Sequence, residues 1–302
     1  MNFNTNNKTV SNHKAGFVNI IGLPNVGKSS LLNALVGERM AIISPKAQTT
    51  RHRLLGFVNG KDFQIVFSDT PGFINEPAYK LHESMNGFVT EALEDADVLL
   101  LVTDKFQKNT EQQTLIDAAK PFAGKCIVVF NKIDLMNEAE LNAHQNKWST
   151  LLPDAKFFPI AAEKKFGMKE LQQLLVSLLP ESPEFYPKDD YTNRPLRFFV
   201  SEIVREKIFF NYEKEIPYST EVVVDEYKEE ENIDKIRCVI FVERESQKPI
   251  IIGKGGEALT KVGKQAREHL ENFIGKKVFL ELRVKVRDKW RSNEKLLKQF
   301  GY

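Results

Sequence analysis

The feature that most constrains this chain is a glycine-rich segment between an apolar run and a helical pattern. Residues 22–29 read Gly-Leu-Pro-Asn-Val-Gly-Lys-Ser, which fits G-x-x-x-x-G-K-S. The apolar residues 17–21 precede it and an amphipathic stretch at 28–36 follows it, as a phosphate-binding loop requires. Glycines let backbone N–H groups wrap a phosphate, and the start of a helix favours negative charge. We therefore predict that these residues bind nucleotide phosphates: Gly22, Leu23, Pro24, Asn25, Val26, Gly27, Lys28 and Ser29.

Short apolar runs alternate with helical patterns over the first 180 residues. This alternation favours an α/β domain with a mostly parallel sheet that is covered on both faces. Asn59-Gly60 separates two of the apolar runs and predicts a hairpin, so we expect one antiparallel strand at the sheet edge. The predicted strands are residues 17–21, 54–58, 63–67, 98–102, 127–130 and 157–160.

Three oxygen-bearing side chains are predicted to hold Mg²⁺ beside the phosphates. Ser29 ends the glycine-rich segment, and Asp69 begins the tetrapeptide Asp69-Thr70-Pro71-Gly72, which fits D-x-x-G at the end of a strand. We expect the N–H of Gly72 to sense the γ-phosphate. For the third Mg²⁺ ligand we favour Thr50, with Thr49 as the alternative.

The base of the nucleotide is predicted to be guanine. Asn131-Lys132-Ile133-Asp134 fits N-K-x-D after the apolar run 127–130. The Asp134 carboxylate can accept hydrogen bonds from guanine N1–H and the exocyclic amine, whereas adenine offers an acceptor at that ring nitrogen. In the following loop, residues 160–162 read Ile-Ala-Ala where Ser-Ala is usual, and we expect the Ala162 N–H to contact the guanine oxygen.

Phe73 occupies the position in which many small GTPases carry a water-orienting glutamine. Phenylalanine cannot orient water, so we expect slow hydrolysis that depends on Lys28, Thr50 and Asn25. The combination of an apolar residue here with Asn25 in the P-loop is similar to a group of GTPases that bind potassium beside the phosphates. Potassium-stimulated hydrolysis is therefore a hypothesis for this chain.

The chain is predicted to contain two domains. Prolines and polar residues without periodicity form a linker, and the order α-β-β-α-α-β follows it. We assign residues 1–15 to a disordered polar tail, 16–180 to the nucleotide-binding domain, 181–196 to the linker and 197–302 to an α+β domain.

A second glycine loop points to RNA. The loop Gly253-Lys254-Gly255-Gly256 fits the G-x-x-G of a KH fold, in which glycines let a nucleic-acid backbone approach closely. Lys261, Lys264 and Arg267 follow on the solvent side of the next predicted helix. Residues 248–302 carry 14 Lys and Arg against 6 Asp and Glu, whereas residues 201–245 carry 7 against 13. This polarised charge favours an RNA-binding surface over a merely glycine-capped helix pair.

Composition indicates where in the cell the protein is found. The net charge is only +2, and the two cysteines lie in apolar runs, which is typical of buried thiols in a reducing compartment. Residues 1–15 lack an apolar secretory core, and no apolar run approaches the ~20 residues that span a bilayer. We therefore expect a cytosolic protein, attached to a membrane at most peripherally.

These segments together resemble the Era family of bacterial GTPases. The likeness is carried by the Pro24-Asn25 P-loop, the residues 48–51 (Gln-Thr-Thr-Arg), the two further nucleotide motifs, the residues 201–207 (Ser-Glu-Ile-Val-Arg-Glu-Lys) and the 253–256 loop. The resemblance implies a P-loop GTPase domain followed by a type II KH domain. It also implies a protein that binds 16S ribosomal RNA near its 3′ end, acts in small ribosomal subunit maturation and associates loosely with the cytoplasmic membrane. We also expect a monomer. An RNA-binding chaperone with little turnover is the alternative, whereas a GTPase with two G domains is disfavoured because one motif set is present.

Overall fold

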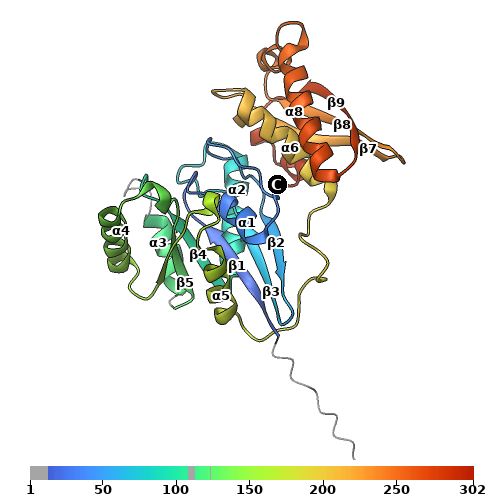
Figure 1. The fold of residues 1–302 in the computed structure, drawn as a ribbon. Coiled ribbons are helices and arrows are strands. Elements are labelled where there is room, and N and C mark those ends of the chain that lie inside the picture. Colours follow the sequence, from blue (N-terminus) through green and yellow to red (C-terminus); the bar gives the residue numbers. More distant parts are fainter. Residues whose placement is uncertain (1–12, 108–112, 123) are drawn as a thin grey trace, which may run out of the picture.

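A six-stranded sheet forms the centre of the first domain in this computed structural model, which describes residues 13–107, 113–122 and 124–302 (Figure 1). The strand order is β2-β3-β1-β4-β5-β6; β2 pairs antiparallel with β3 at the edge, and every other pair is parallel. The predicted mostly parallel sheet with an antiparallel edge strand is therefore confirmed. The strands are β1 (Lys14–Ile21), β2 (Leu54–Asn59), β3 (Phe63–Asp69), β4 (Val98–Thr103), β5 (Cys126–Phe130) and β6 (Lys156–Pro159).

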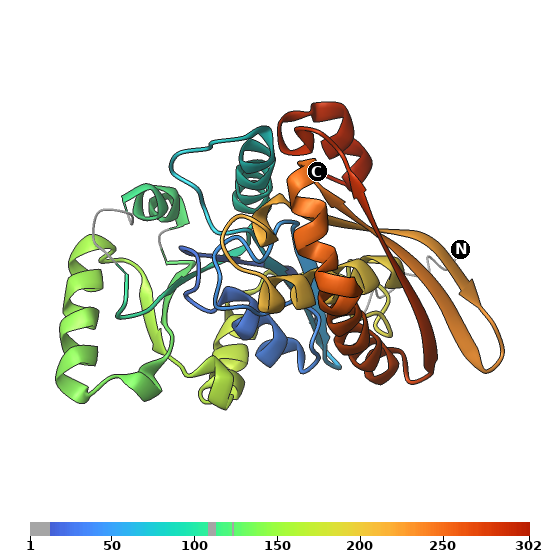
Figure 2. The ribbon, with the colours of Figure 1, turned by 90° about the horizontal axis from the view of Figure 1, so that it is seen from above.

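Helices cover both faces of this sheet, as the view from above shows (Figure 2). β4 and β5 are apolar except for Thr103 at the end of β4, and both are buried along their whole length. That pattern is expected of parallel strands covered on two sides. The helices are α1 (Lys28–Val36), α2 (Lys80–Glu94), α3 (Gln113–Ala119), α4 (Glu138–Leu151) and α5 (Met168–Leu178).

The second domain has the predicted order of helices and strands. Its three-stranded sheet runs β7-β8-β9, with β7 antiparallel and β9 parallel to β8. The elements are α6 (Leu196–Asn211), β7 (Glu221–Glu229), β8 (Ile233–Val242), α7 (Lys248–Ile252), α8 (Glu257–Ile274) and β9 (Lys277–Val286). A separate apolar core lies between α6, α8 and this sheet.

Several boundaries differ from those expected. β1 begins at Lys14, so the last two residues of the expected polar tail belong to the sheet, while residues 1–12 lie outside the described residues. α6 begins at Leu196, five residues before the helix expected from residue 201, because Pro195 is its N-cap and the aromatic residues that follow are buried or half-buried. β6 is shifted by one residue and ends at Pro159, which an edge strand tolerates because one side of its ladder is unpaired.

A short C-terminal helix, α9 (Glu294–Phe300), was not expected and lies against the first domain. Leu81 and Met85 of α2 share a small apolar cluster with Trp290 and Leu297. In the view from above, the C-terminal segment lies beside α2 (Figure 2). The two domains are therefore joined by packing as well as by the linker. In the part of the chain described here, no helix has the length and apolarity needed to cross a membrane.

Candidate functional site

The glycine-rich segment forms a loop between β1 and α1, as predicted. Gly27 has φ 95° and directly precedes α1. A Cβ atom at Gly27 would lie 2.2 Å from the side-chain nitrogen of Asn131, so any larger residue would displace that amide. The Lys28 ammonium donates to the carbonyls of Gly22 and Leu23, both at 3.0 Å. The loop therefore curls around the lysine and leaves backbone N–H groups at the start of α1 for an anion.

Lys28 is a buried cation whose charge suits an anionic ligand. Lys28 is only 6% exposed. Burial lowers the pKa of Lys28 to about 8, and the nearby Asp69 carboxylate opposes that fall. Because burial penalises the ammonium form, a phosphate beside it would restore the charge that water no longer solvates.

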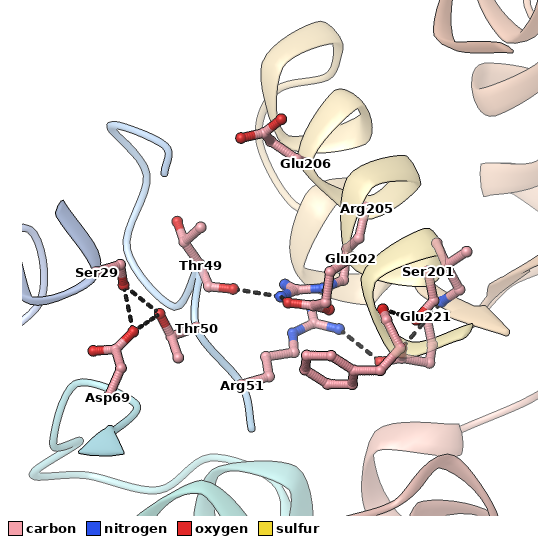
Figure 3. Close-up of polar contacts among 12 residues, drawn as sticks. Ser29, Thr49, Thr50, Arg51, Asp69, Ser201, Glu202, Arg205, Glu206 and Glu221 are labelled. Carbon is pink, nitrogen blue, oxygen red and sulfur yellow. Dashed lines mark hydrogen bonds and ion pairs between the residues drawn. The ribbon is translucent and has the colours of Figure 1, made fainter. Parts of the chain in front are cut away.

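Ser29, Thr50 and Asp69 converge on one point at the end of β3 (Figure 3). Ser29 Oγ donates to Asp69 Oδ2 at 2.6 Å, and Thr50 Oγ1 lies 2.8 Å from Ser29 Oγ and 3.3 Å from Asp69 Oδ2. Asp69 Oδ1 is buried and has no hydrogen-bond partner among the residues that the structure describes. Burial raises the pKa of Asp69, while Lys28 and the two hydroxyl groups oppose that rise. Three hard oxygen donors with one unsatisfied carboxylate atom fit a divalent cation such as Mg²⁺.

Thr49, the alternative to Thr50, points elsewhere. Its hydroxyl donates to the Lys46 carbonyl at 2.7 Å, and its own carbonyl accepts from Arg205. The geometry therefore favours Thr50 over Thr49.

Asn131 connects the phosphate end of the site to its base end. Its side-chain amide donates to the Val26 carbonyl at 2.9 Å and accepts from the Ala162 N–H at 3.0 Å. Lys132, in the left-handed region at φ 62°, donates to the Asn25 carbonyl and to Asp104, both at 2.7 Å. Asp134 is exposed at this end. The Ala162 N–H, which we expected to contact guanine, is occupied by Asn131 in this structure.

The D-x-x-G segment divides between core and pocket. Thr70 is fully buried and donates to the Ile20 carbonyl at 2.9 Å, and Pro71 is buried as well. Gly72 lines the pocket, and a Cβ there would lie 2.9 Å from Pro24 Cγ. Phe73 packs against the apolar core of the first domain. Its ring carries no polar group and therefore cannot orient a nucleophile.

The convergent residues line a pocket of about 430 Å³. Eight of the predicted residues line it directly: Pro24, Asn25, Gly27, Lys28, Ser29, Thr50, Gly72 and Lys132. The predicted residues outside this lining are Gly22, Leu23, Val26, Asp69, Thr70, Pro71, Phe73, Asn131, Ile133, Asp134 and Ala162. Of these, Asp69 and Asn131 make the hydrogen bonds described above, and Asp134 lies at the base end of the site.

Among the lining residues that no sequence pattern indicated are Lys46 and the second domain's Phe210. Lys46 donates to the carbonyls of Phe209 and Tyr212 in the second domain. Neither Lys46 nor Phe210 belongs to a nucleotide motif, so only the packing of the two domains reveals them.

The basic glycine loop lies between α7 and α8, close to the C-terminal end of α6, where the Tyr212 hydroxyl donates to the Ile251 carbonyl at 2.6 Å. Gly253, Gly255 and Gly256 all have positive φ, and a Cβ at Gly253 would lie 2.6 Å from that of Ala258. Lys254 is exposed between them. Lys264 and Arg267 line a groove with Leu259, Leu280 and Leu282, whereas Lys261 is exposed on α8 outside that lining. An apolar floor with a basic edge can accept stacked bases and their phosphates.

Two family models match the chain. Residues 17–132 match a family described as a 50S ribosome-binding GTPase, and residues 215–291 match the KH domain. The matches fall on the two domains seen in the structure.

Full-length relatives cover nearly the whole chain. GTPase Era of Geobacter sp. (strain M21) is 43% identical over 291 residues, which are 96% of this chain and 98% of the relative. GTPase Era of Syntrophus aciditrophicus is 42% identical, covering 96% and 95% respectively. The chloroplastic GTPase ERA1 of Zea mays is 40% identical over 97% of this chain and 71% of its own length.

Solved structures agree in fold. A variant of Aquifex aeolicus Era bound to GDP·AlF4⁻ has a TM-score of 0.91 and 40% identity, and covers 96% of this chain and 99% of its own. Era in complex with MgGDPNP and nucleotides 1506–1542 of 16S ribosomal RNA has a TM-score of 0.90 with the same identity and coverage. A P-loop GTPase domain, a KH domain and full-length likeness together place this chain in the Era family of GTPases.

Proposed function

We propose that this GTPase binds the 3′ region of 16S ribosomal RNA through its KH domain and acts as a nucleotide-controlled switch in small-subunit assembly. The observation that carries the proposal is that the second domain reaches the nucleotide pocket. Phe210 lines that pocket, and Arg205 donates to the Thr49 carbonyl at 2.6 Å. A change in the loop around Thr50 can therefore act directly on the position of the KH domain. The Era complex with a 16S fragment supports the choice of RNA.

GTP is proposed to bind with its phosphates over the loop at residues 22–29 and its base at residues 131–134. Lys28 would contact the β- and γ-phosphates, and Asp134 would accept two hydrogen bonds from guanine. Ser29, Asp69 and Thr50 would hold Mg²⁺, which neutralises charge that develops on the phosphates. An Era relative that contains MgGDPNP supports this cofactor.

Hydrolysis is proposed to be slow and stimulated by potassium. Phe73 is half-buried against the apolar core and has no polar group that could orient the nucleophile. Asn25 is exposed at the pocket with φ 65°, and we expect its side-chain oxygen to bind the cation. We expect turnover to be several-fold faster in potassium than in sodium buffer, and Asn25→Ala to remove this difference. Equal rates in both buffers for the parent protein would contradict the hypothesis.

The switch is tested by reciprocal binding. The affinity of the full chain for a 16S 3′-end fragment is measured with a GTP analogue and with GDP. We expect at least about a fivefold difference, since coupling between two sites in allosteric proteins is commonly this large. Identical affinities would end the coupling proposal. Because one matching family is described by the 50S ribosome, a large-subunit RNA of equal length is the specificity control.

The alternative is an RNA-binding chaperone whose first domain binds nucleotide but barely turns it over. Phe73 favours this alternative, because it is half-buried against the apolar core and puts no polar side chain in the place of glutamine. Steady-state phosphate release with and without small ribosomal subunits separates the two, because only a switch is stimulated by its target. A monomeric state, a cytoplasmic location and peripheral membrane association stay predictions.

A further inference from the structure

The segment at residues 49–51 is held from both sides. The hydroxyl of Thr50 points to Ser29 and Asp69 in the first domain, at 2.8 and 3.3 Å (Figure 3). The residues on either side of it bind the second domain. Thr49 offers its carbonyl to Arg205, and Arg51 extends its side chain in the same direction. Alternate residues of one extended stretch therefore contact different domains.

Arg51 is the more extensive of these links. Its guanidinium donates to the carbonyls of Pro217, Tyr218 and Thr220 at 3.1, 3.0 and 2.7 Å. It also pairs with the Glu221 carboxylate at 3.1 Å, and the two side chains are 1% and 5% exposed. A planar, buried guanidinium with four acceptors has one position, because moving it would leave a charge and several carbonyls without partners.

Arg205 fixes the other side of Thr50. Glu202, one turn earlier on α6, accepts from its Nε at 2.7 Å and from its Nη2 at 2.6 Å. This bidentate pair sets the guanidinium geometry, and the same Nη2 donates to the Thr49 carbonyl at 2.6 Å. The side chain is 1% exposed, so water does not replace the contact easily.

We propose that Arg51 and Arg205 are positioning residues that hold Thr50 at the cation site and thereby make the docked KH domain favour GTP over GDP. Thr50 is needed only when a γ-phosphate is present, so its placement stabilises the GTP-bound form and not the GDP-bound form. This inference rests on the proposed assignment of Thr50 to the magnesium site.

The test measures, in the full chain, the ratio of the affinity for a fluorescent GTP analogue to that for fluorescent GDP. Arg205→Lys and Arg51→Lys keep a positive charge beside Glu202 and Glu221 but lose the planar fork. We expect each to lower the ratio about tenfold through the analogue, because the Thr50 that these residues position contributes to binding only when a γ-phosphate is present. GDP affinity should stay within about twofold of the parent, which a general loss of folding would not allow.

Arg39→Ala is the matched control. Arg39 pairs with Glu206 of α6 at 2.6 Å, so it also joins the two domains, but it lies outside residues 49–51. We expect its ratio to equal that of the parent. An equal loss in Arg39→Ala would overturn the assignment to Arg51 and Arg205, because any domain contact would then suffice.

Thr50→Ala separates this inference from the proposed function. If Thr50→Ala lowers the ratio while both lysine variants keep the parent value, the positioning role is wrong and the magnesium assignment stands. If Thr50→Ala itself leaves the ratio unchanged, the assignment of Thr50 is wrong and the inference falls with it.

Discussion

The nucleotide pocket and the RNA groove of this protein are built in opposite ways. In the pocket the functional groups bind one another: Ser29 and Thr50 with Asp69, and Asn131 with the loops on either side of it. In the groove Lys264 and Arg267 are exposed beside an apolar floor. A preorganised buried network suits one charged ligand in one geometry, whereas an open basic edge suits a flexible polyanion. Substitutions in the pocket should therefore change the binding and hydrolysis of GTP, and those in the groove should change the affinity for RNA.

Replacing Lys28 should give the largest effect and test this contrast most strongly. We expect Lys28→Ala to slow GTP hydrolysis by about 10³-fold or more, because a buried charge beside the phosphates is lost. Steady-state phosphate release measures it. Affinity for the 16S fragment without nucleotide should stay within about twofold, as Lys28 lies in the other domain. A parallel loss of RNA affinity would break the comparison.

A change at Asp134 should alter which base is accepted. We expect Asp134→Asn to lower GTP affinity by about 10²-fold, since the side-chain amide can no longer accept both guanine hydrogen bonds. Affinity for xanthosine triphosphate should rise, because that base presents a carbonyl in place of the amine. Competition against a fluorescent nucleotide measures both. Glu138→Gln, an exposed change at the start of α4, is the control and should leave the preference intact.

The packing between the two domains should lose stability in acid, because His52 lies buried there. This ring stacks on Tyr302, with ring centroids 4.3 Å apart, and lies edge-on to Phe198. Burial lowers the pKa of His52 to about 4; Glu202 and Glu221 oppose that fall, and Arg205 and Arg194 add to it.

As the pH falls below about 6.5, the unfolded chain takes up a proton at His52 that the folded protein excludes until about pH 4. Stability is therefore lost across this window. Between pH 7 and pH 5 we expect the free energy of unfolding to fall by about 2 kcal/mol more in the parent than in His52→Gln. Urea unfolding at the two pH values measures it, and equal losses would show that His52 titrates normally.

Changes in the groove should have the smallest and most salt-dependent effect. We expect Lys264→Ala with Arg267→Ala to weaken binding of the 16S fragment about tenfold near 0.1 M salt. The slope of log affinity against log salt should fall by about 1.4, for two phosphate contacts to single-stranded RNA. Basal GTP turnover should not change. Lys156→Ala, an exposed lysine on β6 of the other domain, should bind like the parent.

The sequence predicted those parts of the fold that are encoded locally. The strand before Gly22 and the helix after Lys28 follow from apolar periodicity and from the glycine loop between them. The hairpin at Asn59-Gly60 is likewise a local signal. α9 was missed because it has only seven residues, and its buried Leu297 belongs to a cluster with Trp290 and with Leu81 and Met85 of α2, which lie more than 200 positions earlier.

The sequence could not predict how the candidate site is shared between domains. Arg51 and Glu221 are 170 positions apart, and nothing in either local pattern indicates that they pair. Arg205 resembles any charged residue on an amphipathic helix until α6 is placed beside residues 49–51. Such contacts depend on how two separately folded cores pack, which no periodicity records.

Gly27 and Asn131 limit each other across more than 100 positions, since a methyl group at the first would occupy the place of the second's amide. The two positions are therefore expected to change together during evolution. A descendant that gains a side chain at position 27 must also give up the asparagine at position 131, and with it the tether between the P-loop and the base-binding loop. Joint substitution at these sites would therefore mark lineages in which this domain no longer serves a guanine nucleotide.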